Sequence, residues 1–482
     1  MQDEFRQIHA NAQVADTLPR ELRLTAKLGA PLALGELGWM STYIVDALMI
    51  GHLPHSALSI SASSLGNTIY YAIAFCVIHL MTGLGTLVAQ SYGRGNTEDC
   101  TRTLLQSMWI VILGTPFVIF TTLAAIPLLS RFGVPADIIA ETSRYLHALV
   151  WSTGPLLLYW ALRRYLQSID RVVLVMVSLL SASVVNLIGD WAFLYGHLGI
   201  HPMGIAGSGW ATCIVRVYML VLLLAGVTLN SSKIGLRFKP AMLRPDFSRL
   251  RALFGIGWAA ALESLTDLGV STFMSILCAR LGSTLLAAHQ VVLDLDAFIY
   301  MVPAGLAYAT VVRVGQSAGR NSLPQVRRSA YASLVLAVGF ISMAALAFTG
   351  FRHFWAGLYT NDPAVVAAAA PIFLICGILQ IGDAVGAILS YALYGLGDTR
   401  TTLVVNTFWY WVIGMPLSYW LTFDDGLGLR GLWIGRAVAA IGSSTMMVIL
   451  WRLRLRRLEG ASSSRRFALF TPVHAKGASL ST

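Results

Sequence analysis

The stretch GIGWAAALESLTDL, residues 255–268, places two acids one helical turn apart in an otherwise apolar run. Glu263 and Asp267 stand at positions i and i+4, and residues with this spacing share one face of a helix. Carboxylates on one face can bind a proton, hold a sodium ion through their oxygens, or act as counter-ions of a cationic ligand. The pair therefore indicates a site for a cation.

Other polar side chains inside apolar runs have spacings that favour shared sites. Asn186 and Asp190 are also four residues apart, and Gln380 and Asp383 lie about 60° apart around a helix. Each pair can therefore reach one site. The full set of acids embedded in apolar runs is Glu36, Asp46, Asp190, Glu263, Asp267, Asp294, Asp296 and Asp383.

Acids in such surroundings need a reason to be there. An ionised side chain at the centre of a bilayer costs about 2.5–3.5 kcal/mol, so these residues generally face a bundle interior or a wet cavity. Burial and a second acid nearby let a carboxylate take up a proton near neutral pH. Two alternatives stay open for each acid: a structural ion pair with Arg216 or Arg436, or a place near a span end from which the side chain reaches water.

The elements that must position these acids are membrane spans. The chain has 482 residues, of which 56% are hydrophobic and 12% charged, and its mean hydropathy is +0.68, whereas soluble domains carry about 25% charged residues. We predict an all-α integral membrane protein with twelve transmembrane helices. Apolar runs long enough to cross a bilayer lie near 28–50, 60–88, 104–128, 141–165, 171–195, 203–229, 252–279, 284–312, 329–350, 364–395, 401–422 and 430–451.

The basic residues predict the orientation of these spans. Most of the 34 lysines and arginines lie in alternate loops and at both termini, in a group that includes Arg163 and Arg313. The positive-inside rule therefore predicts an integral protein of the plasma (inner) membrane with both termini in the cytoplasm. Residues 1–27 contain no apolar signal region, so the first span is expected to direct insertion. This distribution of the net charge of +11 does not favour nucleic-acid binding.

The sequence divides into two similar halves at a polar linker. QSYGRGN at 90–96 matches QSAGRNS at 316–322, and GIAG at 204–207 matches GLRG at 428–431. Six spans return the chain to its starting side, so the halves form two six-helix bundles related by a pseudo-twofold axis along the membrane normal. The predicted segments are a cytoplasmic N-terminal segment at 1–27, an N-lobe at 28–229, a cytoplasmic linker at 230–251, a C-lobe at 252–452 and a basic cytoplasmic tail at 453–482.

Several motifs together resemble the multidrug and toxin extrusion (MATE) family. They are VAQSYGRGN at 88–96, NLIGDWAFLYG at 186–196, LGSTLLAAHQVV at 281–292, LQIGDAV at 379–385 and YGLGDTRT at 394–401. The resemblance extends from about residue 28 to 452. It implies cation-coupled efflux of diverse, often cationic and amphipathic compounds, by alternating access between an N-lobe and a C-lobe.

The resemblance also implies roles for individual residues. Glu263 and Asp383 match the C-lobe cation-site acids of the NorM-like branch, and Asp46 matches the first-span acid of bacterial members. Asn186 and Asp190 match the fifth-span pair of the DinF-like branch. Because the sequence has both sets, H⁺ or Na⁺ remains open as the coupling ion, with Na⁺ at Glu263/Asp383 or at Asp46/Asp190 as the one metal ion considered.

Further residues are expected to support the site or to contact substrate. They are Gln380, Asp267, Gln290 and His289, although a hydrogen-bonded structural role is favoured for His289. The motifs assign no role to Glu36, Asp294 or Asp296.

The predicted function is secondary active efflux rather than enzymatic catalysis, because the sequence has no Walker loop, HExxH or GxSxG motif. We expect a monomer in membrane lipid that exports small molecules and needs no cofactor. The alternative is a lipid-linked saccharide flippase of the same superfamily. Such a protein is expected to line its cavity with cations for a pyrophosphate headgroup, whereas acids dominate the spans here.

Overall fold

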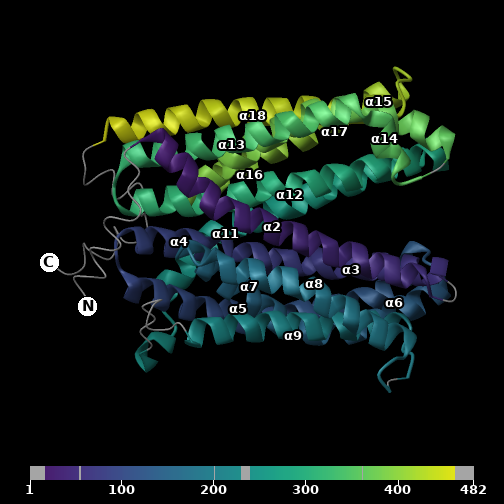
Figure 1. Ribbon diagram of the computed structural model, residues 1–482, viewed down its shortest axis with the longest axis horizontal. Helices are drawn as coiled ribbons and strands as arrows, with labels where there is room; N and C mark the ends of the chain where they lie inside the picture. Colours follow the sequence, from purple (N-terminus) through teal and green to yellow (C-terminus); the bar gives the residue numbers. More distant parts are fainter. Residues whose placement is uncertain (1–16, 54–55, 200, 230–238, 361, 462–482) are drawn as a thin grey trace. The chain divides into compact units, whose positions relative to one another are not determined.

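The computed structural model describes residues 17–53, 56–199, 201–229, 239–360 and 362–461. Within these ranges the chain forms helices, turns and bends and no strand (Figure 1). The all-α class predicted from the sequence is confirmed. Most of the predicted N-terminal segment, much of the linker and most of the basic tail lie outside the described residues.

Nine helical stretches in the described residues are long and apolar enough to cross a membrane. Each overlaps a span predicted from hydropathy. They comprise α3 (Ser56–Leu80) with α4 (Thr82–Gly93), α5 (Thr97–Ala125) with η1 (Ile126–Phe132), α8 (Val172–Tyr195), α9 (Ile205–Leu229), α11 (Phe247–Ala279), α12 (Ser283–Gly319), α13 (Leu323–Gly350), α15 (Pro363–Gly395) and α18 (Leu429–Glu459).

The other three predicted spans are also helical, and two of them are interrupted. The first is α2 (Leu18–Gly51). The second is α6 (Ala136–Leu149) followed by a 3₁₀ turn, η2 (Val150–Ser152), and α7 (Thr153–Ser168). The third is α16 (Arg400–Thr407), a π-helical turn, η4 (Phe408–Gly414), and α17 (Met415–Phe423). The connections include η3 (Pro240–Leu243) and α14 (Arg352–Gly357).

The chain divides into two compact units that do not follow a single cut in the sequence. The N unit contains residues 34–88 and 96–261, and the C unit contains residues 1–33, 89–95 and 262–482. Within the N unit, α8 packs along α9, and α3 and α9 pack against α6; within the C unit, α15 packs against α12, α13 and α18 (Figure 1). The lobe boundaries predicted from the sequence stay a prediction.

Three helices, α2, α4 and α11, contribute residues to both units, and the contacts of α2 and α11 repeat the internal duplication. The first half of α2 belongs to the C unit, where a Cβ atom at Gly29 would lie 2.6 Å from Leu306 Cδ2, so the Leu306 side chain would have to move. The first half of α11 belongs to the N unit, where a Cβ atom at Gly257 would lie so close to the backbone oxygen of Leu80 that it would not fit. Gly257 corresponds to Gly29 in the repeat, and Leu306 corresponds to Leu80. Both pairs are separated by nearly the same number of residues as the matching motifs of the two halves. Glycine permits such close approach of helices.

A buried ion pair holds the start of α2 in the C unit. Glu21 accepts hydrogen bonds from Arg313 Nε at 2.9 Å, from Arg313 Nη2 at 2.7 Å and from Ser329 Oγ at 2.8 Å. The start of α11 is held in the N unit by Arg249, which pairs with Asp99 and donates to Thr103 Oγ1 at 2.9 Å. Glu21 and Arg249 are separated by the same interval as Gly29 and Gly257. The two helix starts are therefore equivalent in the repeat, but α2 contributes the acid of its ion pair and α11 contributes the base. We call these two sets the crossover clamps.

Three arginines that the sequence groups with loop charges, Arg163, Arg164 and Arg313, are in fact buried in helices. Arg313 lies in α12 and forms the clamp with Glu21, while Arg163 lies in α7 and pairs with Glu36. The assignment to loops was wrong because each arginine stands near the end of an apolar run, where composition alone does not separate a helix end from a loop.

Candidate functional site

Glu263 lies in a cage of donors at the point where α11 has entered the C unit. Its carboxylate is buried and accepts hydrogen bonds from Tyr394 Oη at 2.5 Å, Asn406 Nδ2 at 2.5 Å and Thr402 Oγ1 at 2.9 Å. Asn406 in turn accepts a hydrogen bond from Ser443 at 2.5 Å. Within the described ranges, no lysine or arginine forms an ion pair with Glu263. Neutral donors alone hold the acid.

One of these contacts is informative about protons. Thr402 Oγ1 lies 2.9 Å from Glu263 and also 2.7 Å from the carbonyl oxygen of Thr399. A hydroxyl carries one proton, so it cannot donate to both acceptors fully. Both contacts are satisfied together when Thr402 donates to Thr399 and a protonated Glu263 donates to Thr402. The cage can therefore accommodate Glu263 in either protonation state.

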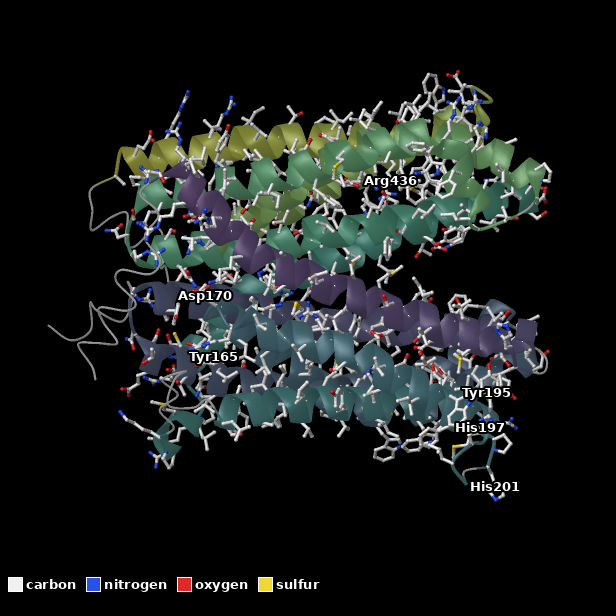
Figure 2. All side chains as sticks on the ribbon, viewed as in Figure 1. Tyr165, Asp170, Tyr195, His197, His201 and Arg436 are labelled. Atoms are coloured by element: carbon white, nitrogen blue, oxygen red, sulfur yellow. The ribbon has the colours of Figure 1, made fainter. Side chains whose placement is uncertain are left out.

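Asp383 faces a cation supplied by the protein itself. Arg436, labelled in Figure 2, projects from α18 and places Nη2 3.6 Å from Asp383 and 3.3 Å from Asp296. Tyr410 donates to Asp383 at 2.5 Å, and Gln380 donates to Asp296 at 3.0 Å. The arginine thus lies between two acids, each of which also has a neutral donor.

The local helix geometry explains how these donors reach their acids. Thr402, Asn406 and Tyr410 stand at four-residue intervals, so on a regular helix they would share one face. Tyr410 lies within the π-helical η4. A π turn widens the helix locally and is frequent at functional sites. Asn406, before the π turn, reaches Glu263, whereas Tyr410, within it, reaches Asp383.

Asp267 connects the two parts of this region. Its side chain is exposed, and it lies within electrostatic reach of Glu263, Asp383 and Arg436. We call Glu263, Asp267, Asp296 and Asp383 the C acid cluster. In the described structure these acids outnumber the arginine that lies among them, so the region attracts cations.

Asp46, Asn186 and Asp190 meet in the N unit, and we call them the N acid cluster. Asp46 comes from α2, and the other two come from one face of α8, as their spacing predicts. Asn186 and Asp190 are fully buried, and Asp46 lies within electrostatic reach of both. Despite this proximity, the three side chains form no hydrogen bond of normal geometry with one another in the described ranges.

The N acid cluster has unused hydrogen-bonding capacity. Within the described part of the chain, Asp46 Oδ1, both carboxylate oxygens of Asp190 and both polar atoms of the Asn186 amide are buried and form no hydrogen bond of normal geometry, although Asp46 lies close enough to Asp190 and Asn186 to interact with both. Buried polar groups are nearly always paired. Carboxylate and amide oxygens are suitable ligands for a proton or a hard cation such as Na⁺.

Arg216 lies near this cluster but is held by neutral groups. It is buried in α9 and donates to Tyr70 Oη at 2.9 Å, to Ser152 Oγ at 2.7 Å and to Tyr71 Oη at 3.0 Å. Asp46 is within its electrostatic reach, yet no ion pair with Arg216 forms among the described residues. The sequence left open an ion pair between an embedded acid and Arg216, and among the described residues Arg216 does not form one.

Glu36 and Asp294 have partners away from the two clusters. Glu36 forms a buried ion pair with Arg163, whose guanidinium lies 4.4 Å from the centre of the Trp160 ring. Asp294 accepts a hydrogen bond from Gln290 at 2.7 Å. Gln290 thus contacts an acid outside both clusters.

His289 occupies a packed, hydrogen-bonded position. Trp433 Nε1 donates to its Nδ1 at 3.2 Å, and Ser275 Oγ lies 3.3 Å from its Nε2. An Nδ1 that accepts places the proton of a neutral imidazole on Nε2. These contacts fit the structural role favoured from the sequence.

The residues that sequence reasoning missed are the neutral donors around the acids. They are Tyr394, Thr402, Asn406, Tyr410 and Ser443. One signal was available: Thr402, Asn406 and Tyr410 form a polar stripe at four-residue intervals in an apolar run. Hydroxyl groups and amides are common in membrane helices, so the stripe alone does not identify its partner.

Comparisons with known proteins support one family. The MatE family matches residues 31–192 and 259–420. The chain is 29% identical over 440 residues to a Bradyrhizobium diazoefficiens protein named "Probable multidrug resistance protein NorM", covering 90% of this chain and 94% of that one. It is also 29% identical over 454 residues to "Multidrug resistance protein PmpM" of Pseudomonas aeruginosa, covering 93% and 92%.

The fold matches solved structures. The crystal structure of the eukaryotic MATE transporter AtDTX14 superposes with a TM-score of 0.83 and 19% sequence identity, covering 95% of this chain and 99% of that chain. MATE structures have twelve helices in two lobes, so the predicted architecture of twelve helices in two lobes is confirmed.

Proposed function

Because the chain belongs to the MATE family, we propose that it is a secondary active multidrug efflux transporter. It exports cationic or amphipathic organic compounds in exchange for H⁺ or Na⁺ by alternating access. The names of its multidrug resistance relatives support this function. MATE transporters are not enzymes and need no cofactor.

The observation that carries the proposal is the pair of embedded acid clusters. Glu263 and Asp383 in the C acid cluster, and Asp46, Asp190 and Asn186 in the N acid cluster, are the proposed groups that bind the coupling ion. Asp267 and Gln380 support them, since Asp267 lies within reach of Glu263 and Asp383 and Gln380 holds Asp296. If one carboxylate binds first the coupling ion and then a cationic substrate, the ion and the substrate compete for it. This competition is a sufficient basis for antiport.

The neighbours of each cluster bear on which ion it can bind. The shared hydroxyl of Thr402 supports a proton on Glu263, since it satisfies a protonated carboxyl. The buried oxygens of Asp190 and Asn186 provide ligands for either a proton or Na⁺. Within the described residues no group of three or more His, Cys, Asp or Glu side chains is arranged around a metal position, so Na⁺ would need amide or hydroxyl oxygens as well.

The arginines inside the spans argue against the flippase alternative, because they already have partners in the protein. A pyrophosphate headgroup needs positive partners, but Arg436 already faces Asp296 and Asp383 and Arg163 pairs with Glu36. Arg216 is held by tyrosine and serine oxygens. The surplus of acids in the C acid cluster favours a cationic substrate.

The surroundings of the transporter are part of the same proposal. The chain is an integral membrane protein, and we place it in the inner membrane as a monomer with both termini in the cytoplasm. The arginines near the end of α18, Arg452, Arg454, Arg456 and Arg457, support this orientation. The proposed partners are small cationic molecules and membrane lipid, and not nucleic acid.

Transport in proteoliposomes tests the function. A proton gradient and a sodium gradient are imposed separately, and movement of a fluorescent cationic dye is followed. A response to one gradient identifies the coupling ion, whereas a response to neither contradicts secondary antiport. The same transport is measured for a control variant, Asp294→Asn, which neutralises an embedded acid that belongs to neither cluster.

A further inference from the structure

A groove of about 1110 Å³ lies in the C unit beside the start of α13 and the end of α18. Four arginines line it, two from each helix: Arg327, Arg328, Arg452 and Arg456. Among the described residues of its lining, Glu459 is the one acid. The groove therefore has a strong positive excess, and it shares no lining residue with either acid cluster.

The rest of the groove is apolar. Leu389, Trp451 and Leu455 are buried side chains of its lining. Tyr331 also lines it and is 53% exposed, and Val335, one turn further along α13, is 42% exposed. A hydrophobic surface on a membrane helix thus continues from the arginines in the direction of the span. The groove combines sites for a negative headgroup and for a hydrocarbon chain.

The internal repeat did not produce this feature in both halves. At the interval that relates QSYGRGN to QSAGRNS, Arg102 corresponds to Arg328, whereas Thr101, Gly226 and Asn230 correspond to Arg327, Arg452 and Arg456. The first half therefore has an arginine at one of the four equivalent positions. The general excess of positive charge at one side of a membrane protein does not account for the three additional arginines of the second half.

We infer that this groove binds an anionic glycerophospholipid from the cytoplasmic leaflet. The lipid phosphate lies among the arginines, whose planar guanidinium groups bind phosphate in a bidentate manner, and an acyl chain follows Tyr331 and Val335. Basic pockets between helices at the cytoplasmic face are suited to such headgroups. The leaflet follows from the orientation given in the proposed function, whereas the headgroup chemistry does not depend on it.

Charge and surface chemistry select the lipid over other occupants. The C-terminal residues 462–482 contain Arg465, Arg466 and Lys476 and no acid, so four arginines would repel them. A free phosphate ion would use the arginines and leave the apolar surface of Tyr331 and Val335 exposed. An amphipathic anion matches both parts of the groove.

Lipid binding to the purified full-length chain tests the inference. Native mass spectrometry and thermal unfolding are measured in neutral detergent with added phosphatidylglycerol or phosphatidylcholine. The variant Arg452→Gln with Arg456→Gln removes two arginines of the groove. We expect binding of phosphatidylglycerol to weaken roughly thirtyfold, because each arginine near an anionic lipid contributes a factor of about five.

A matched variant separates the groove from surface charge in general. Arg454→Gln with Arg457→Gln removes the same charge from the same helix, at positions that do not line the groove, and it is expected to bind phosphatidylglycerol as the unchanged chain does. Equal weakening in both double variants overturns the inference, as does equal binding of phosphatidylcholine. An equal thermal shift with glycerol phosphate, or binding that requires removal of residues 462–482, also overturns it. The measurements do not involve transport, so their failure is distinct from failure of the proposed efflux.

Discussion

The N acid cluster and the C acid cluster differ in what surrounds their carboxylates. In the C acid cluster, Glu263 has three neutral donors, and Asp383 has Tyr410 and a protein cation, Arg436. In the N acid cluster, both oxygens of Asp190 are buried and form no hydrogen bond of normal geometry in the part of the chain that the structure describes, and their close neighbour is another acid, Asp46. A cation that enters the C acid cluster competes with existing partners, whereas one that enters the N acid cluster adds partners.

The difference does not follow from the repeat. At the interval that relates Gly29 to Gly257, Gly35 corresponds to Glu263 and Pro155 corresponds to Asp383. The close helix contacts of Gly29 and Gly257 are repeated, but the acids are not. The close helix contacts are thus repeated in both halves at positions where the functional acids differ. Two sites with different residues can serve different steps of one transport cycle.

Removal of the acids should give the largest effect and the sharpest contrast. We expect Glu263→Gln with Asp383→Asn to reduce both binding of a cationic dye and gradient-driven transport to background, because the C acid cluster loses the charges proposed to bind the coupling ion and the cationic substrate in turn. Asp46→Asn with Asp190→Asn should keep dye binding and lose the response to the gradient. Dye fluorescence and proteoliposome transport measure the two properties. Full activity in both double variants would remove the basis for the comparison.

Removal of one donor from the cage should have the next largest effect. Hydrogen bonds to charged groups contribute about 1.5–3 kcal/mol, so Tyr394→Phe should lower turnover by roughly tenfold or more. The matched variant is Tyr195→Phe. Tyr195, labelled in Figure 2, lies near Asp190 but donates to the carbonyl oxygen of Met49 at 2.7 Å. Its turnover should change less than twofold, and an equal loss in both variants would contradict the proposed difference.

Removal of the protein cation should strengthen substrate binding. Arg436→Gln frees Asp383 and Asp296 from a competing charge, so we expect a cationic dye to bind about tenfold more tightly, a change of about 1.4 kcal/mol. Arg436→Lys keeps the charge and should change dye affinity much less. Fluorescence titration of the purified protein measures the affinity. Weaker binding in Arg436→Gln would show that the arginine orders the acids rather than competing for them.

Neutralisation of an acid outside the clusters should have the smallest effect. Asp294 bonds Gln290 and reaches neither cluster through any hydrogen bond or ion pair that the described residues form. Substitutions away from special features usually change stability by about 0.5 kcal/mol or less. Asp294→Asn should therefore transport dye within about twofold of the unchanged chain, at equal surface expression. A large loss would extend the functional set of acids beyond the two clusters.

Sequence reasoning could predict the elements and the embedded acids because both leave local signals. Hydropathy predicts the spans, and four-residue spacing correctly places Asn186 and Asp190 on one face. The partners of the acids were not predictable in the same way. The sequence offered Arg216 or Arg436 as partners. Arg436 does pair with Asp296 and Asp383, but Arg216 pairs with no acid among the described residues and Glu36 pairs with Arg163. Periodicity defines the face of one helix, whereas an ion pair depends on which other helix packs there.

The crossing of α2 and α11 between units was also not predictable from composition. Hydropathy starts the first span near residue 28, whereas α2 begins at Leu18 and continues through Glu21. Polar residues at the start of a helix are assigned to a loop by hydropathy when the residues that they pair with are unknown. The clamp with Arg313 makes Glu21 part of the buried structure, and a single chain without its packed neighbours gives no sign of this.

The same crossing sets an order for the synthesis of the protein. Glu21 and its partner Arg313 are separated by 292 positions, which a ribosome takes roughly 15–60 s to translate at about 5–20 residues per second. During that interval the beginning of α2 has left the ribosome while the helices that bind it do not yet exist. A first-half fragment would keep this end without its partners, and a second-half fragment would lack the helix start that completes its own packing. The molecule can thus reach its final structure only after the second half has entered the membrane.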